Sequence, residues 1–430
     1  MSNNSKKIHS AVRETRDQHL RRLRDGCRTS FAGLNSLQGW IADELELLNA
    51  TTSWFTVTES ALADQPAYQP TLETDPSAIR TGTNLIGHVF NERSSSLLLY
   101  AHADTDPVAA EHVRAGHGVS ETEDRIVAPG IADDVSGLTA ILSAIEVVAD
   151  SSVDPVHTVT VGSILGKQCG IAGTYELVRQ YDPTDSAVYV HPAESGTGLS
   201  EIKVGSNGVI EFVITVYGQQ PETSELHHTL FTTPGQNPIS VVTRLGRRLE
   251  EWSDTLAKRH RNPAIEELAG RSAGVHLGGV DVDGTAVYRV PETCTLRGVI
   301  SFPPGAQLTT VQGSFEEMIL SFVAAEPGLT TDRIDVEWGD LIADAAQTDL
   351  NSPIADRAAM VLESVTGRTP SWYYGHAASD IRYPMQYWET ESLGFGPRAG
   401  DMGKPTEWID RGEYLDTITA LARLITTPIE

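Results

Sequence analysis

The chain has 430 residues, a formal net charge of -26 and three cysteines. This length predicts two domains, because one hydrophobic core rarely serves so long a chain. The negative charge argues against nucleic acid and membrane surfaces as partners, since both are polyanionic.

Cysteine and lysine usage bear on the protein's surroundings. Cys27, Cys169 and Cys294 are scattered and odd in number, which predicts a reducing compartment without a disulfide frame. No apolar run is long enough for a membrane span and no signal-type segment occurs, so we expect a cytoplasmic location. The six lysines stand against acids spread along the whole chain. This balance is typical of a halophilic protein, and an ordinary acidic enzyme from a high-GC genome is the alternative.

The N-terminal third begins with helices and reaches a buried strand. Residues 5–50 place leucines at helical spacing, which predicts outer helices, and residues 60–82 are rich in proline and predict a loop or an edge hairpin. The apolar run 97–101 predicts a strand buried on both faces, ending at His102-Ala103-Asp104. Chemistry in α/β sheets lies at such carboxyl ends, although a lone His-x-Asp is more often a surface turn.

Strands and helices then alternate. Residues 138–148 and 171–181 predict helices, and residues 156–165 and 187–190 predict buried strands. The second of these strands runs into His191-Pro192-Ala193-Glu194. The alternation predicts an α/β domain with a parallel sheet and right-handed crossovers.

The pattern changes after residue 207. Residues 209–217 alternate apolar and polar side chains, which predicts a half-exposed antiparallel strand with an open edge. Helices are expected at 239–256 and 309–325, and strands at 286–290, 293–301 and 334–338. We therefore predict a first domain at 1–207 that resumes at 341–430, closed by a helix at 413–425, with an inserted α+β domain at 208–340.

Several side chains fall just beyond buried strands or at a helix junction. His102, Asp133, Glu194 and the Gly166-Lys167 turn would converge on one rim if the strands are neighbours. One histidine with two carboxylates suits zinc in a site that keeps positions open for water and substrate. Taken singly, Glu194 could be a solvated rim carboxylate and Asp133 a helix N-cap.

A series of short motifs now carries a resemblance to a known superfamily. They are Ala101–Asp104, Gly130–Asp134, Gly166–Gly173, Pro192–Glu194, Gly205–Gly208, Val290–Cys294, Pro304-Gly305 and Ser379–Arg382. Their order over residues 90–425 resembles the co-catalytic dizinc amidohydrolases, which include aminoacylase, carboxypeptidase G, acetylornithine deacetylase and succinyl-diaminopimelate desuccinylase. The resemblance implies a three-layer zinc-peptidase-like (phosphorylase/hydrolase-like) α/β domain. It also implies an inserted ferredoxin-like lid that serves as a dimerisation domain, and hence a homodimer.

The resemblance also assigns roles to residues. It implies that His102 and Glu194 bind one zinc, that Asp133 bridges two, and that Asp104 orients His102. It further implies that Arg382 binds a substrate carboxylate, and that His227 and Asn237 of the lid contact the substrate.

The departures from the family pattern concern the residues that would bind the second metal ion or act as the general base. Lys167 and Gln168 stand where the family has its general base and a ligand, and Gly403 stands where it has a histidine. A neutral amide cannot supply the charge that holds a dication, and an ammonium group repels one. The sequence therefore predicts at most one zinc ion.

Two functions stay open on these grounds. One is a metal-dependent amidohydrolase for a small amide or peptide that bears a carboxylate, with Lys167, Asp104 and Arg382 as catalytic residues. The other is a catalytically silent homologue that binds such a ligand or forms a dimeric scaffold. Lys167 and Lys404 either face the vacated metal position or point into solvent. Cys169 and His376 are expected to be structural.

Overall fold

The computed structural model divides into two compact units. It describes residues 3–57, 83–105, 107–165, 167, 172–192, 195–221, 230, 237–284, 286–287, 289–377 and 379–429. Unit 1 comprises residues 1–205 and 347–430, and unit 2 comprises residues 206–346. The sequence placed these boundaries after residues 207 and 340. The predicted hairpin at 60–82 lies outside the described residues.

Unit 1 is built on a mixed sheet with a parallel centre. Its strand order is β1-β2-β6-β3-β7-β16-β8-β14. The strands are β1 Thr51–Thr56, β2 Thr83–Val89, β3 Ser95–His102, β6 His157–Ile164, β7 Ser186–Val190, β8 Glu201–Lys203, β14 Ser371–Tyr373 and β16 Ser392–Phe395. Neighbours from β6 to β16 run parallel, whereas β1, β2 and β6 pair antiparallel. The predicted parallel sheet is therefore confirmed at the centre.

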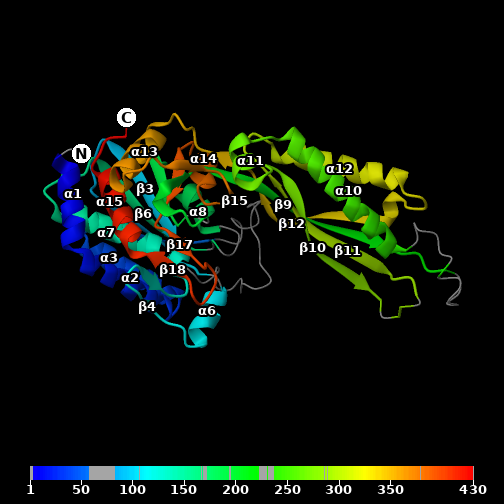
Figure 1. The fold of residues 1–430 in the computed structure, drawn as a ribbon, viewed down its shortest axis with the longest axis horizontal. Coiled ribbons are helices and arrows are strands. Elements are labelled where there is room, and N and C mark those ends of the chain that lie inside the picture. The colour runs from blue at the N-terminus through cyan, green and yellow to red at the C-terminus, as the bar shows by residue number, and fades with distance from the viewer. Residues whose placement is uncertain are drawn as a thin grey trace. The chain divides into compact units, whose positions relative to one another are not determined.

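Helices cover both faces of this sheet. On one face α7 (Ser136–Asp150) packs against β3, α2 (Arg16–Ser30) and α15 (Arg411–Ile425). On the other face α8 (Ala172–Gln180) and α14 (Arg382–Tyr387) cover the cluster that contains Leu98, Tyr100 and Tyr189. Helices α1 (Asn3–Glu14), α3 (Leu34–Leu47), α6 (Pro107–Arg114) and α13 (Pro353–Thr366) also belong to this unit (Figure 1). Side chains of β3 are buried on both faces from Leu97 to His102, because helices cover each face of the sheet. The expected three-layer α/β domain is therefore confirmed.

A small second sheet of unit 1 supports the loop that precedes α7. It has the order β17-β18-β5-β4, formed by Ala399–Gly400, Trp408–Asp410, Arg125–Val127 and Ser120–Glu121. A kinked turn, Ile131–Val135, connects β5 to α7. The sheet therefore brings residues near 407 beside the turn that contains Asp133.

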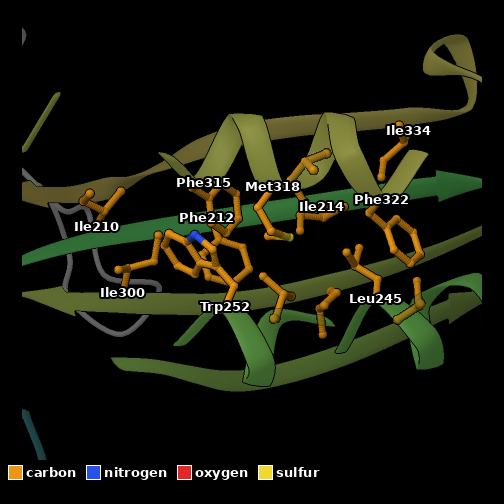
Figure 2. Close-up of a cluster of buried hydrophobic side chains, with 14 of the residues drawn as sticks. Ile210, Phe212, Ile214, Leu245, Trp252, Ile300, Phe315, Met318, Phe322 and Ile334 are labelled. Atoms are coloured by element: carbon orange, nitrogen blue, oxygen red, sulfur yellow. The ribbon is translucent and has the colours of Figure 1, made fainter. Parts of the chain in front are cut away.

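Unit 2 has a ferredoxin-like topology. Its elements are β9 Gly205–Tyr217, α10 Pro238–Arg259, α11 Pro263–Ala269, β10 Gly274–Asp283, β11 Thr293–Phe302, α12 Leu308–Ala325 and β12 Ile334–Ala343. The strand order β10-β11-β9-β12, antiparallel throughout, is that of a β-α-β-β-α-β unit with one short extra helix. Figure 2 shows its core, where Phe315, Met318 and Phe322 of α12 meet Phe212 and Ile214 of β9.

Two expectations for unit 2 were wrong. Strand β9 is not at an edge, because β11 and β12 pair with its two sides, and β10 is the edge strand on the described path. The described residues of 286–290 form no strand, whereas 274–283 do. Gly278 and Gly279 interrupt the alternation there, and a register shift between Leu277 and Gly279 marks a bulge. Because of these two glycines, the sequence pattern did not predict this strand.

In the part of the chain that the structure describes, no helix combines the length and the apolar character needed to cross a membrane.

Candidate metal centre

Two histidines meet at the carboxyl ends of neighbouring parallel strands. Tyr100 of β3 is in register with Tyr189 of β7, and two residues further along lie His102 and His191. Side chains two residues apart lie on the same face of a strand. His102 and His191 therefore lie on the face of the sheet that carries Tyr100 and Tyr189. The rings of His102 and His191 stack with centroids 5.6 Å apart, and His191 stacks on Tyr189 at 5.2 Å.

The outward nitrogen of each histidine is fixed by a main-chain carbonyl. His102 Nδ1 lies 2.7 Å from the Asp104 carbonyl oxygen, and His191 Nδ1 lies 2.6 Å from that of Pro192. A carbonyl oxygen only accepts hydrogen bonds, so both Nδ1 atoms must donate. In the neutral imidazoles this leaves both Nε2 atoms as lone-pair donors directed to the site.

Both Nε2 atoms converge on one oxygen of Asp133. His102 Nε2 is 2.8 Å and His191 Nε2 is 2.9 Å from Asp133 Oδ1. The ligand atoms of these three residues all lie within 4.8 Å of one another, which makes them a group that could hold a metal ion. Two imidazole lone pairs and a carboxylate oxygen repel one another, and a cation between them would remove this repulsion. The donor set therefore fits a divalent cation.

The pKa values of Asp133 and His102 also indicate that the site favours a positive charge. Burial opposes ionisation of Asp133, but the charges and hydrogen bonds of the two histidines hold its pKa well below the ordinary value. Burial likewise opposes protonation of His102, but the Asp133 carboxylate and the hydrogen bonds to Asp133 and Asp104 raise its pKa well above the usual value. A proton on Nε2 thus competes with a metal ion for one position.

Two further buried carboxyl groups border the site. Asp134 is fully buried, and burial together with the Asp133 charge raises its pKa well above the ordinary value. Glu407 is 1% exposed, and its carboxylate accepts four backbone N–H groups. Burial, assisted by the Asp133 charge and opposed by these hydrogen bonds, raises the pKa of Glu407 to about 7.

The structure describes some of the other residues singled out in the sequence. Asp104 supplies its main-chain oxygen to His102, and its carboxylate Oδ1 is 3.5 Å from Nδ1. Arg382 is buried and donates from Nε to the Ser379 carbonyl at 3.1 Å. The Asn237 side chain caps α10 by accepting the Ile239 N–H at 3.0 Å.

Both lysines that the sequence left ambiguous fall within the description. Lys167 is half-buried. Lys404 has 66% of its side chain exposed and places Nζ 3.1 Å from Asp401 Oδ1. The solvent-facing alternative therefore describes Lys404. The remaining candidates, Glu194, His227, Gln168 and Cys169, lie outside the described residues, as does the side chain of His376.

His191 is the site residue that the sequence interpretation missed. That interpretation took Glu194 from the same segment, because Pro192-Ala193-Glu194 resembled a family motif. A signal for His191 was present, since both strands end in the pattern Tyr-x-His: Tyr100-Ala101-His102 and Tyr189-Val190-His191. In parallel strands of equal register this repeat places two imidazoles side by side.

Comparisons with known proteins identify the family of this chain. The model of peptidase family M20/M25/M40 matches residues 98–427. Carboxypeptidase G2 from Pseudomonas sp. (strain RS-16) is 26% identical over 139 residues, which cover 32% of each chain. The aligned part thus spans about a third of that relative's length.

Two solved structures share the fold across nearly the whole chain. A tripeptidase from Staphylococcus aureus superimposes with a TM-score of 0.72 at 13% identity, covering 96% of this chain and 98% of the other. A dinuclear metal-binding peptidase of the M20 family from Bacillus subtilis gives a TM-score of 0.61 at 12% identity, covering 96% and 99%. At these identities the likeness concerns the fold alone.

Proposed function

The chain belongs to peptidase family M20/M25/M40, and from this premise we propose that it is a metal-dependent hydrolase of amide bonds that works with a single zinc ion. The ligands in this proposal are His102, Asp133 and His191. The supporting observation is the convergence of two Nε2 atoms on Asp133 Oδ1 while both Nδ1 atoms are held by carbonyls. Three protein ligands leave positions open for water and substrate, as in catalytic zinc sites.

The proposed chemistry divides between ion and chain. A bound zinc ion would polarise the substrate carbonyl and lower the pKa of bound water. The carbonyls of Asp104 and Pro192 hold the two imidazoles in the ligating tautomer. We retain Lys167 as the catalytic group at the position of the family's base, and Arg382 as the group that binds a carboxylate of a small amide or peptide. Within this proposal His227 and Asn237 keep their predicted substrate roles, and His191 takes the third ligand position that the sequence assigned to Glu194.

The absence of a second metal in this proposal follows from Gly403. The sequence places Gly403 where the family has a histidine ligand, and a glycine offers no ligating side chain. Gly403 has φ of 72°, and its N–H bonds to Glu407. This backbone is one that glycine adopts freely and most other residues adopt at a cost. The same feature supports the second candidate, a catalytically silent homologue that binds a carboxylate-bearing ligand.

Metal analysis tests the proposal directly. We expect purified protein to hold one zinc ion per chain, and His191→Gln to weaken zinc binding at least about 100-fold, because even the outer partners of ligands are worth about 10–100-fold. His88→Gln is the matched control, since His88 is a half-buried histidine of the same unit that bonds Thr160. Equal zinc affinity in both variants would contradict the proposed ligand set.

Hydrolysis separates the two candidate functions. The zinc-loaded protein is assayed with N-acylated amino acids and small peptides, and the same protein treated with a chelator serves as the control. We expect turnover that chelation abolishes and zinc restores. Stoichiometric zinc without any turnover would favour the silent homologue.

A further inference from the structure

Glu407 is buried beside the proposed zinc site without contributing an atom to the ligand set. We propose that Glu407 is a positioning residue, whose carboxylate fixes the turn before α7 so that the Asp133 side chain reaches both histidines. This inference rests on the proposed function for its catalytic meaning. Its structural content concerns the described residues alone.

The hydrogen bonds of Glu407 divide evenly between its two oxygens. Oε1 accepts the N–H groups of Ala132 at 2.6 Å and Asp133 at 3.1 Å. Oε2 accepts those of Gly130 at 3.2 Å and Gly403 at 3.3 Å. One carboxylate thereby joins three N–H groups of the Asp133 turn to a second loop.

The turn needs such an acceptor because its backbone is irregular. Gly130 has φ of 72°, and Asp133 and Asp134 have non-helical backbone angles. Buried N–H groups in an irregular segment lack the partners that a helix or sheet supplies, and leaving them unpaired is costly. One of the bonds runs to the N–H of Asp133 itself, so the carboxylate acts on the ligand residue with no intermediary.

A second glutamate of the same unit, which is half-buried, offers a control with similar hydrogen bonds. Glu413 of α15 accepts the N–H groups of Leu199 at 3.1 Å and Arg398 at 2.9 Å. Its carboxylate, like that of Glu407, joins two loops through backbone donors. The backbone groups that it accepts belong to none of the three proposed ligands. A substitution that only lowers stability should therefore change zinc affinity equally at either glutamate. A loss of positioning should appear only in variants of Glu407.

The experiment compares Glu407→Gln with Glu413→Gln in the full chain. Glutamine keeps the size but replaces one acceptor oxygen by an NH2 group, which faces backbone donors. We expect Glu407→Gln to weaken zinc binding about 10-fold or more, as loss of an outer partner does, and Glu413→Gln to leave zinc affinity unchanged. In the metal-free protein, amide hydrogen exchange of residues 130–133 should be at least about 10-fold faster in Glu407→Gln only.

Two results would overturn the inference. One is unchanged exchange of residues 130–133 in Glu407→Gln, and the other is an equal loss of zinc affinity in both variants. If Glu407→Gln does not fold, Glu407→Asp replaces it, because the shorter side chain keeps the charge but cannot span both loops. Failure of the wild-type protein to bind zinc would contradict the proposed function, and the exchange measurement on the metal-free protein would still decide the role of Glu407.

Discussion

Buried histidines serve two different purposes in this chain. His102 and His191 have both ring nitrogens engaged, one by a carbonyl and one by Asp133. His19 of α2 is equally buried, but it has Thr15 Oγ1 beside Nε2 at 2.8 Å and, among the described residues, no hydrogen-bond partner on Nδ1. A carboxylate at hydrogen-bond distance makes the first two attractive to a cation, and its absence leaves His19 neutral.

The pH dependence of stability should therefore carry the signature of His19. Burial, opposed by Glu146 and assisted by Arg22, lowers its pKa from 6.5 to about 4. Between these pH values His19 is protonated in the unfolded chain but not in the folded chain. The free energy of unfolding therefore decreases as the pH falls from 6.5 to 4. The difference corresponds to roughly 3 kcal/mol.

Denaturant titrations at several pH values measure this effect. We expect His19→Gln to remove that part of the slope between pH 6.5 and 4 and to leave the slope above pH 7 unchanged. A variant whose unfolding free energy follows the wild-type pH profile throughout would refute the assignment.

At the scale of elements, sequence reasoning succeeded where the signal is local. The helical spacing at 239–256 and 309–325 predicted α10 and α12 within a few residues, and the apolar runs predicted β3, β6 and β7. The central position of β9 could not be predicted, because strand order depends on pairing between distant segments. His191 was missed for a related reason, since its role depends on the register between β3 and β7.

The approach of α7 to the sheet depends on one glycine. A Cβ atom on Gly137 would lie 1.9 Å from the Val190 carbonyl oxygen and 2.7 Å from Asp134 Oδ1. The first contact is with backbone, which cannot rotate away. The close approach of α7 to the strand that leads to His191 therefore requires a residue without a side chain at position 137.

Gly137→Ala should consequently destabilise unit 1 in spite of the higher helix propensity of alanine. We expect the free energy of unfolding to fall by roughly 1–3 kcal/mol, the usual cost of overpacking. Gly39→Ala in α3 is the control, because a Cβ there meets no atom within 4 Å, and it should raise stability by about 0.5–1 kcal/mol. Denaturant unfolding measures both, and a neutral Gly137→Ala would contradict the close approach.

At the scale of the whole molecule, the candidate metal ligands and the exposed apolar edge strand belong to different units. The candidate ligands belong to unit 1, whereas unit 2 offers an edge strand with apolar side chains in solvent. Val280 and Val282 of β10 are 57% and 43% exposed. An edge strand presents unpaired backbone donors and acceptors, which a second copy of the chain can pair by symmetry.

We therefore expect a homodimer formed through the inserted domain, with β10 at the interface in place of the strand that the sequence suggested. Val280→Lys should shift the protein toward monomer, because a charge on an edge strand opposes pairing between copies. Met360→Lys is the control, since Met360 is an equally exposed apolar side chain on α13 of unit 1. Light scattering at micromolar concentration should show a dimer for the wild-type protein and for Met360→Lys, and a smaller mass for Val280→Lys. A monomeric wild-type protein would refute the dimer, and a dimer that survives Val280→Lys would place the interface away from β10.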